Sequence, residues 1–210
     1  MMRSSPTDRA DPLTRSPVAR TVVRPSRSVN SGLTHLSTKA AEFYVRYRYP
    51  DWLETHSRVV GRIAECLVRS RRSGAPPIDK DAVVLAAYLH DIGRSPLLTG
   101  DGRDHNILSG FVLAAEGLPA CIELARRHPI YAVHDPGLVP RTAEEKLVFV
   151  ADRRGGQGVE PLEDRSRDTA RRHPKYAAEI ERAVPIAKEI EREVFADITF
   201  PPDELAERVR

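Results

Sequence analysis

Six side chains of the sequence could bind metal ions together. They are four histidines and two aspartates: His56, His90, Asp91, His105, His128 and Asp152. Neutral imidazole and carboxylate suit iron, manganese, zinc, cobalt or nickel, whereas the lack of a thiolate in the set disfavours a structural zinc site. Six donors are more than one metal takes while it keeps positions open for water. The set therefore favours two metal ions that share a bridging carboxylate.

Such a site requires a fold that brings these residues together, since they extend from residue 56 to residue 152. Each of them lies at or near the end of an expected helix with an apolar face. His90 and Asp91, for example, end an apolar segment in "YLHDIGRS". An antiparallel bundle places helix ends close together at one pole of its core. Each histidine taken alone is more often structural or exposed, so the prediction rests on the set.

The elements that must position these residues are helices. Apolar residues recur at helical spacing from about residue 36 onward, and no alternating strand pattern appears. The sequence predicts an all-α bundle of about seven helices in one domain, residues 36–200. The expected helices cover 36–48, Asp51 to Gly74, 79–90, a segment from His105 to Gly117, 119–128, 142–154 and 174–196. Residues 155–168 are expected to form a loop, and residues 201–210 a C-terminal tail.

Charge and composition exclude several classes of protein. The formal charge is +3, but residues 1–38 hold six arginines against two aspartates, so the rest of the chain is close to neutral. We expect residues 1–35 to be a disordered basic tail, and we expect no nucleic-acid partner. The sequence contains no run of about 18 apolar residues, so we expect no membrane span. Cys66 and Cys121 are expected to be buried free thiols in a reducing compartment, which indicates a cytoplasmic protein.

The order of the candidate ligands resembles that of a known family. A histidine at position 56, the pair His90–Asp91 within "LHDIG", and Asp152 follow one another as in the HD superfamily of metal-dependent phosphohydrolases. "HDIG" is a widespread form of the core motif of that family. The resemblance spans roughly residues 50–155 and implies an α-helical domain with a metal-activated water.

The resemblance also implies which residues hold which ion. The first metal would be bound by His56, His90, Asp91 and Asp152. The two further histidines, His105 and His128, match the extra pair of the two-metal branch, in which Asp91 would bridge to a second metal. That branch includes HD-GYP-type phosphodiesterases and diiron oxygenases. The glycine-tyrosine-proline signature is absent from this sequence, so cleavage of cyclic dinucleotides is not supported.

A phosphate substrate requires cationic donors. The family often places a basic residue four positions after the first histidine of its motif, and Arg94 stands there. We therefore predict catalytic roles for Asp91 and Arg94, with Arg103, Arg127 and Lys146 as further candidates for phosphate binding. Trp52 is interpreted as a core residue, Gly93 as a left-handed helix end and His134 as a loop histidine.

The sequence thus predicts a hydrolase of a nucleotide or another small phosphate ester, with divalent transition metals as cofactors. Two alternatives remain open. The same six ligands would serve a diiron oxygenase, and a non-catalytic HD module could sense a ligand. The charged helix over 174–196 could also mediate a homo-oligomer. The sequence identifies neither the substrate nor the metal.

Overall fold

The structure, a computed structural model, describes residues 31–209. These residues form nine α-helices joined by short 3-10 turns and loops, and they contain no β-strand. The all-α prediction is confirmed for this part of the chain. Of the predicted basic tail, residues 1–30 lie outside the described residues, and residues 31–35 belong to the first helix. The helices are α1 (Ser31–Arg46), α2 (Asp51–Arg69), α3 (Lys80–Leu89), α4 (His105–Ala115), α5 (Ile122–Arg126), α6 (Ala143–Arg154), α7 (Leu162–Arg172), α8 (Ala177–Ala196) and α9 (Leu205–Arg208).

Two of these helices were not predicted. Helix α7 begins inside the range 155–168, which the sequence indicates as a loop. It buries only Leu162, Arg165 and Ser166, so its sequence carries no apolar stripe by which a helix is recognised. Charged pairs one turn apart cover its exposed face. The short helix α9 lies within the predicted C-terminal tail, and its Leu205 is fully buried in the core.

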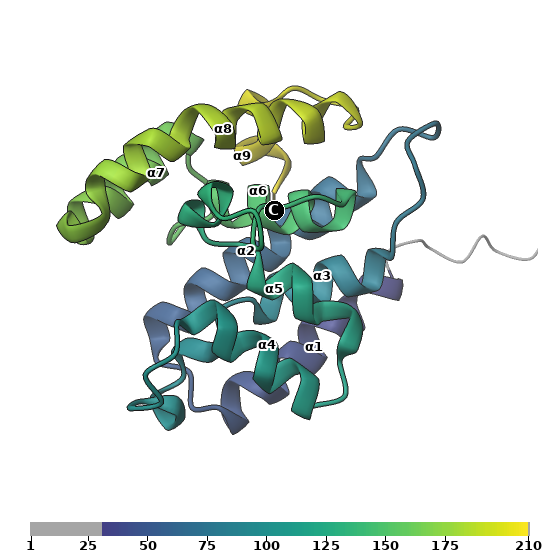
Figure 1. Cartoon of the computed structure of the whole chain (residues 1–210). Coiled ribbons are helices and arrows are strands. Elements are labelled where there is room, and N and C mark those ends of the chain that lie inside the picture. The colour runs from purple at the N-terminus through teal and green to yellow at the C-terminus, as the bar shows by residue number, and fades with distance from the viewer. Residues whose placement is uncertain (1–30, 210) are drawn as a thin grey trace, which may run out of the picture.

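Helix α3 occupies the centre of the bundle. Every residue from Ala82 to Leu89 is buried, and α1, α2, α5 and α6 pack around it (Figure 1). Helix α2 comes especially close, because a Cβ atom at Gly61 would lie 2.2 Å from the ring of Tyr88. Since α3 is surrounded by other helices, its C-terminal end lies inside the protein. The residues that follow it, His90 and Asp91, are therefore buried as well.

The C-terminal part of the chain fixes the end of α6. Helix α8 packs against both α6 and α7 (Figure 1). The buried guanidinium of Arg154 lies 2.8 Å from the carboxylate of Glu191 on α8 and also donates to the carbonyl groups of Glu160 and Pro202. This single side chain thus ties the last turn of α6, which carries Asp152, to three other segments. Removing one partner of such a buried ion pair strongly destabilises the fold.

Cys66 and Cys121 are free and buried, as predicted. Burial raises the pKa of both thiols, that of Cys121 to about 12, so neither is a reactive thiolate at neutral pH. Within residues 31–209, no helix has the length and apolar content that crossing a lipid bilayer requires.

Candidate metal centre

His56 enters the site from the second turn of α2. Its side chain is buried, and the ring is held between two other parts of the chain. The Nδ1 atom lies 3.2 Å from the carbonyl oxygen of Gly156, which follows α6. The Nε2 atom lies 3.2 Å from the Nε2 atom of His90. The loop after α6 therefore fixes the orientation of a histidine that lies a hundred residues earlier in the chain.

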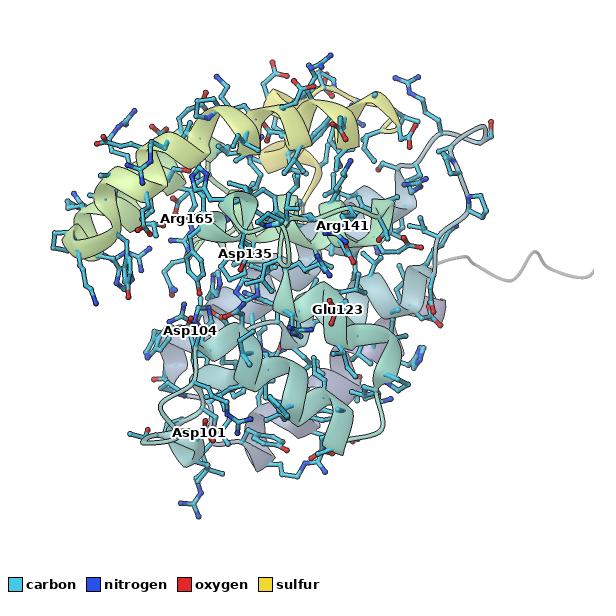
Figure 2. All side chains as sticks on the ribbon, in the orientation of Figure 1. Asp101, Asp104, Glu123, Asp135, Arg141 and Arg165 are labelled. Atoms are coloured by element: carbon cyan, nitrogen blue, oxygen red, sulfur yellow. The ribbon has the colours of Figure 1, made fainter. Side chains whose placement is uncertain are left out.

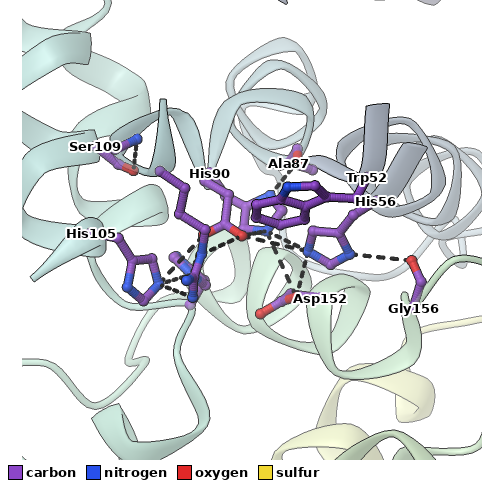
Figure 3. Close-up of polar contacts among 12 residues, drawn as sticks. Trp52, His56, Ala87, His90, His105, Ser109, Asp152 and Gly156 are labelled. Atoms are coloured by element: carbon purple, nitrogen blue, oxygen red, sulfur yellow. Dashed lines mark hydrogen bonds and ion pairs between the residues drawn. The ribbon is translucent and has the colours of Figure 1, made fainter. Parts of the chain in front are cut away.

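His90 and Asp91 lie where the chain leaves α3. His90 is the C-cap and keeps helical dihedral angles, whereas Asp91 has φ −101° and ψ 16° and leads into the 3-10 turn η1 (Ile92–Arg94). This change of direction brings Oδ2 of Asp91 to 3.7 Å from Nε2 of His90. Figure 3 shows His90 in contact with His56 and Asp152. His90 is fully buried and Asp91 is 4% exposed. The apolar helix α3 therefore delivers an imidazole and a carboxylate into the core.

Gly93 is required for a reason other than the predicted one. It does not adopt a left-handed conformation, since only Gly100, Gly102 and Gly117 among the described glycines have a positive φ. Instead, a Cβ atom at Gly93 would lie 2.0 Å from the carbonyl oxygen of His105. The absence of a side chain lets α4 begin directly against η1. Its first residue, His105, thereby reaches the neighbourhood of Asp91.

His128 is positioned in the same way as His90. It follows the end of α5 by two residues, and its Nδ1 atom lies 2.5 Å from the carbonyl oxygen of Ala125, three residues earlier. The Nδ1 atom of His90 lies 2.8 Å from the carbonyl of Ala87, again three residues earlier. In both cases a carbonyl group of the last helical turn orients the ring and leaves Nε2 directed into the site.

Asp152 comes from the last turn of α6. One carboxylate oxygen, Oδ1, lies 3.3 Å from Nε2 of His56 and 3.7 Å from Nε2 of His90. The other oxygen, Oδ2, accepts a short hydrogen bond from the guanidinium of Arg153. Asp152 thus divides its two oxygens between the imidazole cluster and a buried cation.

Asp91 divides its oxygens between two pairs of histidines. Its Oδ2 atom lies 3.7 Å from the Nε2 atoms of both His56 and His90. Its Oδ1 atom lies 3.4 Å from that of His105 and 3.3 Å from that of His128. Within the described residues, three sets of three side chains each offer one ligand atom per residue, and the ligand atoms of a set lie within 4.8 Å of one another. The sets are His56–His90–Asp91, His90–His128–Asp152 and Asp91–His105–His128. All six predicted ligands therefore meet in one cluster.

The hydrogen bonds of the rings are consistent with a cation in this cluster. A backbone carbonyl only accepts, so the Nδ1 atoms that face carbonyls carry the ring protons of His56, His90 and His128. In a neutral ring the Nε2 atom then presents a lone pair. These lone pairs point at one another and at two carboxylates, and Oδ1 of Asp91 has no hydrogen-bond partner. A metal ion is the group that satisfies such convergent acceptors.

The charge states also suit metal binding. Burial lowers the pKa of His90 to about 4 and lowers the pKa of His105 well below its ordinary value, so both rings are neutral at pH 7. Burial alone raises the pKa of Asp91 and of Asp152. The charge of Arg94 on the former and of Arg153 on the latter reverses this effect, and both pKa values lie well below the ordinary value. Neutral imidazoles and ionised carboxylates are the forms that bind metal.

Arg94 reaches the cluster, as its position in the motif predicts. Its Nε atom donates to Oδ2 of Asp91 at 2.9 Å, and its Nη2 atom lies 2.9 Å from Nε2 of His105. The side chain is 36% exposed, so it stands at the border between the cluster and solvent. A guanidinium in this place can contact an anion that approaches the cluster.

The other predicted cationic residues are engaged elsewhere. Arg103 pairs with the exposed Asp101, and Arg127 lies between Glu123 and Glu145. Lys146 pairs with Glu193 on α8. His134, interpreted as a loop histidine, is exposed in a 3-10 turn and faces the carbonyl of Glu179. None of these four side chains belongs to the donor sets of the cluster.

Trp52 is not the core residue that the sequence indicates. Its side chain is 52% exposed, and it precedes His56 by about one turn of α2. Gln157 donates to its carbonyl group, which connects it to the loop after α6. The sequence held a signal for this position, because Trp52 and His56 are four residues apart and therefore lie on the same face of a helix.

Two buried arginines were also missed. Arg153 follows Asp152 directly, so its position next to a predicted ligand was the only signal in the sequence. Arg165 lies on α7, where the sequence predicts a loop, and carried no signal at all. Both residues are buried near Asp152.

A comparison with known protein families agrees with this geometry. The sequence model of the HD domain matches residues 53–155, which include all six ligand candidates and Arg94. Helices α7 to α9 lie beyond the matched residues. No curated protein and no solved structure shows significant similarity to the chain.

Proposed function

Because residues 53–155 are an HD domain, we propose that the protein is a metal-dependent phosphohydrolase that acts on a nucleotide or another small phosphate ester. HD domains are typically metal-dependent phosphohydrolases, and the buried histidines and aspartates of this one are consistent with a metal site. The observation that carries the proposal is the position of Asp91. Its two oxygens face two different histidine pairs, as a carboxylate shared by two ions would.

We propose that His56, His90, Asp91 and Asp152 hold the first ion and that Asp91, His105 and His128 hold the second. The donor sets His56–His90–Asp91 and Asp91–His105–His128 support this assignment. Bound divalent cations lower the pKa of a coordinated water toward 7 and offset the charge of a phosphoryl group. The chain contributes four imidazoles, and the Nδ1 atoms of His56, His90 and His128 each face a backbone carbonyl. It also contributes two carboxylates that remain ionised at neutral pH.

Arg94 would bind the phosphoryl group that reacts. Its contacts with Asp91 and His105 place the guanidinium at the edge of the second ligand set, and its partial exposure leaves it accessible to an entering substrate. A planar guanidinium matches the oxygens of a phosphate and stabilises the charge that develops on them. This role makes Arg94 a catalytic residue in the proposed reaction.

The exposed indole ring of Trp52 supports a nucleotide, rather than another small phosphate ester, as the substrate. An exposed indole ring close to a buried ionic cluster is an unusual use of a large apolar side chain. Aromatic rings stack on nucleobases regardless of base identity. A nucleobase that stacks on Trp52 would place its phosphate group over the adjacent cluster.

The decisive experiment is metal analysis of the purified full-length chain, followed by a phosphatase screen. We expect two divalent ions per chain, and one ion after the substitution His105→Ala, because His105 belongs only to the donor set Asp91–His105–His128. His134→Ala is the matched control, because His134 is an exposed histidine outside the cluster, and it should retain both ions. One ion or none in the wild-type protein would overturn the two-metal site.

The screen should use nucleotides and simple phosphate esters with manganese, cobalt or nickel, in the presence and absence of oxygen. Release of phosphate that does not depend on oxygen is the expected result. Oxygen consumption that requires iron, without phosphate release, would instead identify an oxygenase. Ligand binding with neither reaction would identify a sensing module.

A further inference from the structure

Two arginines are buried beside Asp152, on the side of the cluster that Arg94 does not contact directly. Arg153 is 5% exposed and Arg165 is 9% exposed, although arginine is almost never buried to this extent without a partner. Arg153 follows Asp152 on α6, whereas Arg165 comes from α7, which lies outside the HD domain proper. Figure 2 shows Arg165 extending from α7 on the side of the molecule where Asp104 also lies.

Three nitrogen atoms of these two side chains are buried without a hydrogen-bond partner. Only Nη2 of Arg153 has a charged acceptor, Oδ2 of Asp152, while its Nε and Nη1 atoms have no partner. The Nε atom of Arg165 has no partner either. The Nη1 atom of Arg165 lies 3.8 Å from the carboxylate of Asp168. Buried donors without acceptors are costly, and those of a charged group are the most costly.

The charges of the two groups are not balanced locally. Burial lowers the pKa of Arg165, and the nearby positive charge of Arg153 lowers it further, while Asp152 acts in the opposite direction. Asp152 is thus a negative charge that both guanidinium groups share, and its other oxygen already faces the imidazoles. A second anion between the two arginines would balance their charge and accept from the free N–H groups.

We propose that Arg153 and Arg165 form a binding subsite for a phosphate group that neighbours the reacting one, so that the substrate carries a diphosphate or longer phosphate chain. This inference rests on the proposed function, since it assigns the reacting phosphate to the ligand cluster and Arg94. The guanidinium fork suits phosphate, because it donates two parallel hydrogen bonds to two oxygens. Arg153 also contacts Asp152, so its substitution would disturb the ligand cluster as well as the proposed subsite. Substitution of Arg165 therefore tests the subsite separately from the cluster.

The test compares two probes that are not hydrolysed, inorganic phosphate and methylenediphosphonate. Each is titrated calorimetrically into the full-length chain at a metal content verified to be equal in all variants. We expect the wild-type protein to bind the diphosphonate more tightly than phosphate. The substitution Arg165→Gln should reduce this preference about tenfold or more and leave the affinity for phosphate unchanged. Arg167→Gln is the matched control, because Arg167 is an exposed arginine on the same helix.

A structural role for Arg165 would give a different result. The wild-type preference would then persist in Arg165→Gln, and the unfolding temperature would fall; this outcome would overturn the subsite. If the glutamine variant does not fold, Arg165→Lys retains the charge but loses the fork, and it should still weaken the preference. Because the titration requires no turnover, loss of the preference in a protein without phosphatase activity would support the subsite and refute only the hydrolase.

Discussion

The Nε2 atoms of His56 and His90 lie 3.2 Å apart, and the Nδ1 atom of each ring faces a backbone carbonyl. When both rings are neutral, their Nε2 lone pairs point at each other. Neither can donate a hydrogen bond across the gap, so the contact is unfavourable unless a cation lies between the rings. The two histidines come from α2 and from the end of α3, and the packing of these helices enforces the contact.

Removal of metal should therefore destabilise the fold. We expect treatment with a chelator to lower the unfolding temperature by roughly 5–10 °C, because an ion that binds only the folded state stabilises it. Scanning fluorimetry with and without chelator, followed by addition of manganese, measures the effect. The His56→Ala variant lacks a ligand of the first ion and should respond less. An equal response of the variant and the wild type would argue against this ligand.

The close approach at Gly93 gives a second prediction. The substitution Gly93→Ala would place a Cβ atom against the carbonyl of His105 and push α4 away from η1. We expect a loss of about 1–3 kcal/mol in the free energy of unfolding, together with loss of the second metal ion. Gly74→Ala is the control, because no atom lies within 4 Å of the Cβ position there. Full metal content in Gly93→Ala would contradict the positioning role.

Arg94 should affect turnover more than folding. The substitution Arg94→Gln removes the cation that faces the reacting phosphate, and we expect kcat to fall by roughly a hundredfold to a thousandfold. Arg103→Gln removes an arginine that pairs with an exposed aspartate, and it should leave kcat unchanged. Steady-state kinetics with the best substrate of the screen distinguishes the two. Comparable kcat values in Arg94→Gln and the wild type would exclude a catalytic role.

Trp52 should contribute to nucleotide binding. We expect Trp52→Ala to raise KM for nucleotides about tenfold, since stacking on a base contributes roughly 1–3 kcal/mol. Stability should change little, because the side chain is 52% exposed. Phe111→Ala, which removes another exposed aromatic ring, is the control. An unchanged KM, or an equal rise for an aliphatic phosphate ester, would show that the indole does not contact a base.

Acid should destabilise the metal-free protein. Burial lowers the pKa of His90 from 6.5 to about 4, so the unfolded chain binds the proton more readily than the folded one between these values. The free energy of unfolding should then fall as the pH decreases from 6.5 toward 4, by a total on the order of 3 kcal/mol from this group. Urea unfolding of the wild-type and His90→Asn proteins across this range measures it. The variant should show a shallower dependence on pH, and parallel curves would refute the assignment.

The sequence alone determined the fold class and the composition of the site. Helical periodicity, the break after "LHDIG" and the spacing of the four histidines depend on local chemistry, which is visible in a single stretch of chain. The six ligand candidates were predicted from these patterns, and Arg94 was predicted from the resemblance to the HD superfamily. The structure brings all seven together. The location of α7 and the exposure of Trp52 were not predicted, because both depend on how the helices pack against one another.

Only the tertiary structure decided how the site is divided. The direction of each Asp91 oxygen depends on the angle at which η1 leaves α3, and the reach of His105 depends on the close contact at Gly93. The burial of Arg153 and Arg165 depends on α7, which has no apolar pattern of its own. Residue types and spacing specify which donors are available, but helix packing across long sequence separations fixes where they point.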